Sequence, residues 1–414
     1  MAISDKTVRN RILFVVFILA VFRLLAAIPI PGIDTMRLSQ FLANNQFFGI
    51  LNIFSGGGLS NLSIIMLGVG PFITASIIMQ LLTIMVPKLK RLYHEEGESG
   101  RKKFAQYSRV LTMPLALIQG FSLMVILQQQ GILGDLSLFE RMVNLTVITA
   151  GAMFVMWLGE LISEYGIGNG ASLIIFAGII AALPGQIGQL LFTFEPSQIP
   201  TYIGFAAAAL LVIAGVVLVS EAERPIPVTY AKRVRGIKSY GGVSTYLPLR
   251  VNQAGVMPII FALSILLFPQ IIGNFLSGMS SATVSRIGEL LIAFVQNQLF
   301  YGIAYFLLVF VFTYFYTAVT FDPDSLSTNL QKNGAFIPGI RPGQATADHV
   351  SRVLSRTTMV GALFLGVIAV LPLVVKSITG ITSIALGGTA LLIVVSVVLD
   401  LMKKIDAQIS MREY

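Results

Sequence analysis

The sequence contains no cysteine, only two histidines and few charged residues for its length. Asp, Glu, Lys and Arg make up 11% of the 414 residues, whereas a soluble domain carries about a quarter. Without cysteine, disulfides, thiolate metal sites and cysteine nucleophiles are excluded together. Because 55% of the residues are hydrophobic and the mean hydropathy is +0.84, we expect most of the chain to lie out of contact with water.

Recognisable catalytic and metal-binding patterns are also missing from the sequence. His94 and His349 stand in no spacing typical of metal ligands. Neither a G-x-x-x-x-G-K-[ST] phosphate loop nor a G-x-S-x-G nucleophile elbow occurs. Asp400 falls at the end of an apolar stretch without the second acid that an intramembrane aspartyl protease needs, and we expect it to cap that end beside Lys403. Glu160 is expected to be solvated. The sequence therefore predicts no enzyme and no cofactor.

Long uncharged stretches predict an all-α polytopic membrane protein. A helix needs roughly 20 apolar residues to cross a bilayer, and a helix satisfies its own backbone inside lipid. The first stretch follows Lys6, Arg9 and Arg11, which is also typical of a signal peptide, but no clear small-residue cleavage site comes after it. We predict ten spans, centred near Val16, Ile73, Ile118, Phe154, Ile175, Leu210, Ile260, Leu308, Gly366 and Val394.

The basic residues indicate how these spans are oriented. Most of the 28 Lys and Arg residues fall before span one, in the loops after spans two, six and eight, and after span ten. The opposite face keeps Arg37, Arg141, Arg286 and Lys376. The positive-inside rule makes the basic face cytoplasmic, with both termini on it. The net charge of +9 is thus explained by topology rather than by a nucleic-acid partner, and Arg23, late in span one, is expected to snorkel or to pack inside the protein.

One uncharged stretch is too long to be a single span. Leu38–Pro87 is interrupted by Ser55-Gly56-Gly57-Gly58, and Phe47–Phe54 is too short to cross. We predict a short re-entrant helix followed by a span from about Leu62, because such structure is tolerated where it is buried or lines a cavity. An ordinary external loop is the alternative.

Two cytoplasmic loops are too long to be simple connectors. Pro227–Leu247 alternates in part, with Gly236 at its turn, which predicts a projecting hairpin. The loop Phe321–Val350 is rich in glycine and proline, and long loops of this kind are usually functional.

Helical spacing places mixed polar and apolar stripes on three spans. Each stripe is apolar near its middle and polar toward an end, which suits a water-filled passage pinched by aliphatic side chains. The alternative is that the polar residues bond neighbouring helices. The stripes are Val69, Ile73, Ser76, Gln80 and Thr83; Gln253, Val256, Ile260 and Ser264; and Thr389, Ile393, Ser396 and Asp400.

Several ordered motifs resemble one family along essentially the whole chain. The motifs are Ile28-Pro29-Ile30-Pro31-Gly32-Ile33-Asp34, Phe54-Ser55-Gly56-Gly57, Gly70-Pro71-Phe72-Ile73-Thr74-Ala75-Ser76-Ile77-Ile78-Met79-Gln80-Leu81-Leu82, Glu96-Gly97-Glu98-Ser99-Gly100-Arg101, Gly166-Ile167-Gly168-Asn169-Gly170 and Phe336-Ile337-Pro338-Gly339-Ile340-Arg341-Pro342-Gly343. They resemble the SecY family, the channel subunits of the general protein translocase.

The resemblance implies two inverted, pseudo-symmetric halves, residues 1–183 and 201–414, joined by a hinge at 184–200, with cytoplasmic loops at 221–250 and 321–352. By position, the pore ring of the family falls on Val69, Ile73, Ile175, Ile260 and Ile393. The plug, within about 46–61, falls on Asn52, Ile53, Phe54, Ser55, Gly56, Gly57, Gly58, Leu59, Ser60 and Asn61. The lateral gate between spans two and seven falls on Ser76, Gln80, Gln253 and Val256.

The resemblance also implies partners and a location. These partners are SecE, SecG, the SecA motor, the ribosome, signal sequences and unfolded client polypeptides, with membrane lipid around the channel and no nucleic acid other than ribosomal RNA. Arg341 matches an arginine by which the family engages its motor or ribosome, and the hairpin basic residues Lys232, Arg233, Arg235 and Lys238 are further contact candidates. The implied location is a bacterial-type plasma (inner) membrane.

Three departures from the family pattern concern these sites. Pro225 and Ile237 stand where the hairpin is usually basic, and Val69 stands where the ring is commonly isoleucine. The predicted function is a protein-conducting channel with a lateral gate. The alternative is an inverted-repeat secondary transporter, which would be favoured by an ionisable pair at mid-membrane, a feature that the sequence does not contain.

Overall fold

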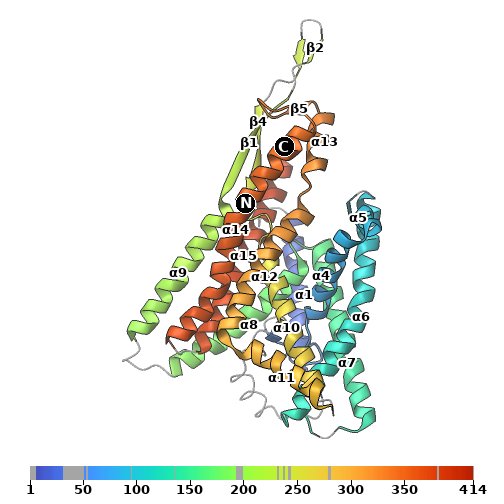
Figure 1. Ribbon diagram of the computed structural model, residues 1–414, viewed down its shortest axis with the longest axis vertical. Coiled ribbons are helices and arrows are strands. Elements are labelled where there is room, and N and C mark those ends of the chain that lie inside the picture. Colours follow the sequence, from blue (N-terminus) through green and yellow to red (C-terminus); the bar gives the residue numbers. More distant parts are fainter. Residues whose placement is uncertain are drawn as a thin grey trace.

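The computed structural model describes residues 6–30, 51–52, 55–94, 96–134, 136–192, 199–230, 233–235, 238–240, 244–277, 281–379 and 382–413. The chain forms an elongated bundle of helices with a small group of strands projecting from one end (Figure 1). The amino terminus of α1 and the carboxyl end of α15 lie toward that same end. The predicted sites Ile53, Phe54, Lys232, Gly236 and Ile237 lie outside the described residues.

Each of the ten predicted span centres falls in a helix of its own. These helices are α1 (Lys6–Ala26), α4 (Gly70–Met85), α6 (Gly97–Gln129), α7 (Leu138–Tyr165), α8 (Gly170–Phe192), α9 (Ile199–Glu221), α10 (Met257–Ser277), α12 (Gln298–Thr320), α14 (Gln344–Thr379) and α15 (Thr382–Glu413). By length and apolar composition alone, four helices in the described ranges could each cross a membrane, or five if α4 and α5 (Pro87–His94) count as one bent span. The axis bends by 114° between α4 and α5.

The prediction that span two begins near Leu62 is wrong, because α4 begins at Gly70. The residues from Ser55 to Val69 run through turns instead. Leu62 and Gly68 have φ values of +41° and +54°, which no right-handed helix contains. Pro71 then stands in the first turn of α4, where its missing N–H has no intrahelical partner to lose.

Two smaller helices flank the long ones. α11 (Ala282–Gln296) connects α10 to α12 at the end of the bundle opposite the strands, and α13 (Pro323–Lys332) follows α12 at the strand end (Figure 1). Asp322 caps α13 by accepting a hydrogen bond from the amide of Asp324 at 3.1 Å.

The strands confirm the predicted hairpin after span six. β1 (Glu223–Tyr230) pairs antiparallel with β4 (Ser244–Arg250), and β2 (Arg233–Arg235) pairs with β3 (Lys238–Tyr240) farther out. Sequence reasoning missed β5 (Ala335–Phe336), which pairs with the other edge of β1 and gives the strand order β4-β1-β5. The two long loops therefore share one sheet.

Two predicted boundaries fall inside helices. α14 begins at Gln344, inside the loop predicted to reach residue 352, so the helix extends well beyond its uncharged part. α8 continues through Pro184 to Phe192, past residue 183, at which the prediction ended the first half. The predicted boundaries follow charged residues and proline, which mark where the apolar stretches end. A helix extends beyond such a point as long as its backbone hydrogen bonds can continue. Whether 184–200 acts as a hinge stays a prediction.

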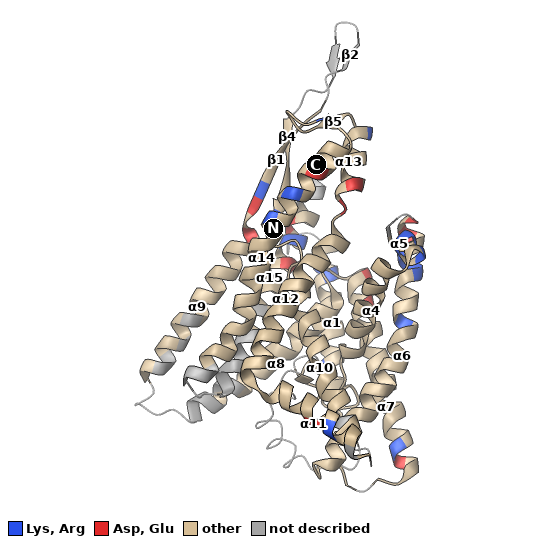
Figure 2. Ribbon diagram, in the orientation of Figure 1, with Lys and Arg blue, Asp and Glu red and all other residues tan. Residues whose placement is uncertain are grey.

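The core lies at the centre of the bundle. The largest hydrophobic cluster draws on α1, α4, α7, α8, α9, α10, α12, α14 and α15, and a second one packs α6 and α7 against the turns at 59–67. Figure 2 shows the charged residues among the described ones gathered toward the ends, above all near β1 and α5, with a largely uncharged middle. This distribution is the one expected for a bundle that spans lipid.

Candidate pore, plug and lateral gate

The five aliphatic side chains assigned to the pore ring come from separate parts of the bundle. Val69 caps α4, Ile73 lies in the first turn of that helix, and Ile175, Ile260 and Ile393 lie in α8, α10 and α15. None exposes more than 4% of its surface, and all five belong to the central hydrophobic cluster. An aliphatic constriction of this kind can hold back water and ions, because apolar walls dewet a narrow passage.

The described part of the plug segment is held in shape by its own polar groups. The hydroxyl of Ser55 donates to the carbonyl of Asn52 at 2.9 Å and accepts from the amide of Leu59 at 3.0 Å. The Oδ1 of Asn52 accepts from the amide of Ser60 at 2.9 Å. Ser55 and Leu59 are fully buried, so these bonds satisfy groups that would be costly to leave unpaired.

Glycine lets the plug segment touch a helix at backbone level. Gly56 has a φ of +64°, a region that glycine occupies without steric cost. A Cβ atom at Gly178, in α8, would overlap the Cα of Gly56. A Cβ at Gly56 itself would overlap the ring of Phe22, in α1. The segment is therefore wedged between α1 and α8 with no room for a side chain at either glycine.

Two polar side groups tie the same segment to the region around α1. The guanidinium of Arg23 donates to the carbonyl of Gly56 at 3.1 Å, and the amide of Asn61 donates to the carbonyl of Ala26 at 3.3 Å. Arg23 was predicted to snorkel or to pack inside the protein, and the structure shows the second of these. The sequence did not indicate its partner, which lies 33 residues away.

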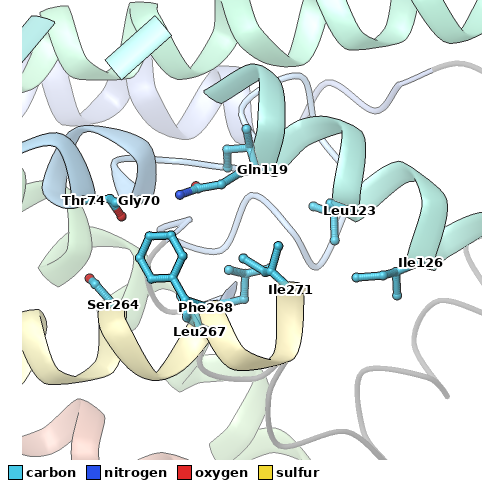
Figure 3. A pocket seen from close by; sticks show the side chains of 11 residues that line it. Gly70, Thr74, Gln119, Leu123, Ile126, Ser264, Leu267, Phe268 and Ile271 are labelled. Carbon is cyan, nitrogen blue, oxygen red and sulfur yellow. The ribbon is translucent and has the colours of Figure 1, made fainter. Parts of the chain in front are cut away.

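A cavity opens along the seam where α4, α6 and α10 meet (Figure 3). About 30 Å³ is open to the centre of a water-sized molecule, enough for a water. Phe268 points from α10 toward Gly70 and Gln119. The lining residues are Leu51, Leu67, Gly70, Thr74, Gln119, Leu123, Ile126, Ser264, Leu267, Phe268 and Ile271.

The four residues assigned to the lateral gate do not line this cavity. Ser76 and Gln80 are half-buried on α4, and Oε1 of Gln80 is buried without a hydrogen-bond partner among the described residues. Gln253 and Val256 precede α10, which begins at Met257, so the prediction of a helical stripe through them is wrong. The cause is Gly255, whose φ of +60° interrupts right-handed helix.

Only some of the polar residues that line the cavity had been predicted from the sequence. Ser264 belongs to a predicted stripe, whereas Thr74 and Gln119 do not. Gln119 is the one amide within the apolar stretch Val110–Leu127 of α6, and such a residue gives no periodic signal. Its position opposite α10 follows only from the packing of the three helices.

The strand end forms a small core of its own. Ile226, Val228 and Leu249 from the hairpin pack with Ala335 and Val350 from the next loop and α14. Sequence reasoning predicted a projecting hairpin and a second long loop, and no contact between them. The structure instead joins both loops through one hydrophobic cluster and one sheet.

Arg341 is exposed in the second of these loops, between β5 and α14. Its carbonyl accepts a hydrogen bond from the hydroxyl of Thr346 at 2.9 Å, and Ser327 donates to the carbonyl of Gly343 at 2.6 Å. These bonds fix the loop on both sides of Arg341. The backbone of Arg235 pairs with that of Lys238 in the outer hairpin, which also carries Arg233.

Ion pairs correct two further predictions. Glu160, expected to be solvated, pairs with Arg109 and links α7 to α6. Asp400, expected to cap the end of its span, instead lies inside α15 and pairs with Lys404 at 2.7 Å, because the i, i+4 spacing favours that contact. Lys403 instead reaches Glu221 of α9 at 2.9 Å. Over the part of the chain that the structure describes, no group of three His, Asp or Glu residues could hold a metal ion.

Comparison with known proteins connects this arrangement to curated relatives. The family model described as SecY matches residues 63–402. The chain is 42% identical over 427 residues to the protein translocase subunit SecY of Mycobacterium tuberculosis, with 98% of the chain and 96% of the relative covered. For protein translocase subunit SecY of Synechocystis sp., the identity is 42% over 420 residues, with 98% and 93% covered.

Solved structures share the fold at low identity. One described as the structure of a protein conducting channel superposes with a TM-score of 0.66 at 19% identity, covering 95% of this chain and 91% of that chain. A structure concerned with the plug domain of the SecY protein gives 0.64 at 20%, covering 95% and 91%. The idle yeast Ssh1 complex bound to the yeast 80S ribosome gives 0.67 at 16%, covering 95% and 89%. Because the family model spans most of the chain and the curated relatives align over nearly all of it, the chain belongs to the SecY family of protein translocase subunits.

Proposed function

We propose that the chain forms a protein-conducting channel that is sealed by two barriers in series. The first is the ring of Val69, Ile73, Ile175, Ile260 and Ile393, and the second is the plug segment 52–61. The observation that carries this proposal is the burial of all five ring side chains in one cluster, although they come from both ends of the sequence. A passage through the centre of the bundle has to part these side chains.

The ring acts as a gasket around a moving chain. Aliphatic side chains make no directional bonds, so they fit any client sequence while they exclude water and ions. A valine at position 69 removes one methylene relative to isoleucine and gives a slightly wider ring. The plug adds a removable seal, which leaves its place between α1 and α8 when a client enters.

The seam between α4 and α10 is the lateral gate of this proposal. Apolar client segments leave through it into lipid, where they are more stable than in a water-filled pore. The cavity at Gln119 and Phe268 already interrupts the contact between the helices. The end of the seam nearer the strands carries the four residues assigned to the gate, and a signal sequence first meets the gate there. These residues are Ser76, Gln80, Gln253 and Val256.

The strand end is the docking surface for the partner that drives translocation. Arg341 and the hairpin residues Lys232, Arg233, Arg235 and Lys238 supply positive charge for acidic protein surfaces or ribosomal RNA. The yeast Ssh1 complex, which shares this fold, is bound to a ribosome. We further propose the SecA motor as a second driver, and SecE and SecG as subunits of the same complex.

The chain works as a passive path in this proposal, and not as an enzyme. We propose that the chain lies in a bacterial-type inner membrane with the strand end and both termini on the cytoplasmic side, because the basic loops support that orientation. The proposed halves, 1–183 and 201–414, part about a hinge within 184–200. A secondary transporter remains the alternative function, and saturable uptake of small solutes would favour it.

Ionic conductance of the purified complex in planar bilayers tests the proposal. The intact complex is expected to be silent, and a variant that lacks residues 52–61 is expected to conduct in bursts. Translocation by the deletion variant, measured in parallel, shows that it is folded. A deletion variant that translocates clients yet stays silent would contradict the assignment of the plug.

A further inference from the structure

Helix α11 (Ala282–Gln296) has three distinct sides. Gly288 is buried and Val295 half-buried on the side that meets α10. Ile287, Leu290 and Phe294 stand at i, i+3 and i+7 on a second side and are exposed by 53%, 65% and 41%. The third side, also exposed, carries Arg286, Glu289, Ala293 and Gln296. A helix with one packed, one apolar and one polar side suits a boundary between protein, lipid and water.

The packed side of α11 touches α10 at backbone level. A Cβ atom at Gly288 would lie 2.6 Å from both the carbonyl oxygen of Gly273 and the amide nitrogen of Ser277. A Cβ at Gly273 would lie 3.0 Å from the carbonyl oxygen of Gly288. The hydroxyl of Ser285 also donates to the carbonyl of Ser277 at 3.3 Å. Close approach of this kind holds the two helices together with little room for sliding.

The exposed apolar side of α11 continues onto α12. The rings of Phe294 and Phe300 stack across the junction, with centroids 6.0 Å apart. From Phe300 the exposed apolar row runs along α12 through Ile303, Leu307 and Val311, each exposed by more than half. α12 lies within a helix long and apolar enough to cross a membrane, so this row faces lipid. The stripe on α11 is the outer continuation of that lipid-facing surface.

We propose that α11 is an interfacial helix that lies in the outer lipid leaflet and ties the outer end of α10 to the membrane surface. Ile287, Leu290 and Phe294 enter the boundary between headgroups and acyl chains, and Arg286 and Glu289 stay in water or among the headgroups. α11 lies at the end of the bundle opposite the basic strands (Figure 1), where charge-based orientation places the outer leaflet. The role of α10 as a gate helix rests on the proposed function, whereas the lipid contact does not.

Tryptophan fluorescence in vesicles of brominated phosphatidylcholine tests the lipid contact. The chain has a single tryptophan, Trp157, so the background is Trp157→Phe in the reconstituted complex. Leu290→Trp is compared with Glu289→Trp, its neighbour on the polar side, and with Leu307→Trp, which faces lipid on α12. Bromine atoms are placed near the headgroups in one vesicle set and near the chain ends in another.

Leu290→Trp is expected to lose more than about half of its emission to bromines near the headgroups, since interfacial helices bury their apolar side by about 5–10 Å. It should lose less to bromines near the chain ends, whereas Leu307→Trp should show the reverse order. Glu289→Trp is expected to respond more weakly than Leu290→Trp in both sets and to be quenched by aqueous iodide.

Two results would overturn the proposal. If Leu290→Trp is quenched by iodide and not by bromines, α11 lies in water. If it is protected from both quenchers, another protein chain covers the stripe. Quenching of Leu307→Trp in the same vesicles shows that the bundle is inserted, and a translocation assay of each variant separates failure of this inference from failure of the channel.

Discussion

The plug joint and the gate seam are both contacts of the central bundle, but they are built differently. At the plug joint, Gly56 meets Gly178 without space for a side chain, and Arg23 holds the carbonyl of Gly56. At the seam, a cavity separates α4, α6 and α10, and a buried oxygen of Gln80 lacks a partner among the described residues. One contact is interlocked and hydrogen-bonded, whereas the other contains a cavity and is loosely packed.

The difference indicates how each contact opens. A segment that is bonded mainly within itself and wedged at two glycines leaves as a unit, because partial movement would create overlap or break several bonds at once. A seam with a cavity and an unpaired oxygen has less packing energy to lose. We therefore expect the seam to move more readily than the plug, and the following predictions test that order.

The largest effect is expected from locking the seam. Thr74 and Ser264 face the same cavity from α4 and α10, and the chain contains no cysteine of its own. Thr74→Cys combined with Ser264→Cys, joined by a short thiol crosslinker, should abolish membrane insertion of apolar segments. Insertion is measured with a reconstituted client before and after reduction of a cleavable crosslinker.

Leu123→Cys combined with Ile126→Cys is the matched control, because both residues line the cavity from the single helix α6. Crosslinking that pair should leave insertion unchanged. Full insertion through the locked seam would show that α4 and α10 do not form the gate.

The next largest effect is expected at the plug joint. Gly178→Leu forces a side chain into the Cα of Gly56, and overpacking of this kind costs about 1–3 kcal/mol or more. Because the overlap is with backbone, which cannot give way, the upper value applies. The plug should be displaced and the ionic leak in planar bilayers should rise by roughly a hundredfold, since each 1.4 kcal/mol is a factor of ten. Gly185→Leu on the same helix meets open space and should not leak. A silent Gly178→Leu complex that still translocates would contradict the wedge.

A smaller effect is expected at Arg23. Arg23→Ala removes the bond from the guanidinium to the carbonyl of Gly56, and bonds from charged groups contribute about 1.5–3 kcal/mol. Because Arg23 is half-buried, we expect its bond to contribute the lower value of this free energy. The loss corresponds to roughly tenfold more frequent leak openings. Arg9→Ala, at an exposed position of the same helix, is the control for loss of charge. Equal leak in both variants would assign the effect to charge and not to the bond.

The smallest effect is expected from replacing a polar side chain of the seam by an apolar one. Gln80→Leu removes a buried oxygen that has no hydrogen-bond partner among the described residues and should stabilise the closed seam by about 1 kcal/mol. Apolar segments should then insert several-fold more slowly, whereas leak through the plug joint stays unchanged. Faster insertion in this variant would mean that the oxygen of Gln80 has a partner in the closed state and that the seam is not loose there.

The helical framework could be predicted from the sequence because the bilayer imposes a simple rule. Each predicted span centre, from Val16 to Val394, lies in its own helix. The hairpin around Gly236 was predicted for a similar reason, since alternation and a turn residue act locally. Ile175 could be assigned to the ring only by family resemblance, because its helix has no distinct polar stripe.

Contacts between distant segments could not be predicted. β5 has two residues and carries no strand pattern, yet it joins the two loops. The approach of Gly56 to Gly178 and the pairing of Arg109 with Glu160 join residues far apart in the chain, which no local period encodes. The start of α4 at Gly70 was missed because a positive φ at Leu62 is not a preference of leucine.

The path of a client through the ring is the central claim, and photocrosslinking of a stalled client tests it most directly. A photoreactive residue is placed at Ile260, in the ring, and separately at Leu127, which is equally buried but belongs to the cluster around α6. The stalled client is predicted to crosslink at Ile260 and not at Leu127. Crosslinks at Leu127 with none at Ile260 would contradict the account.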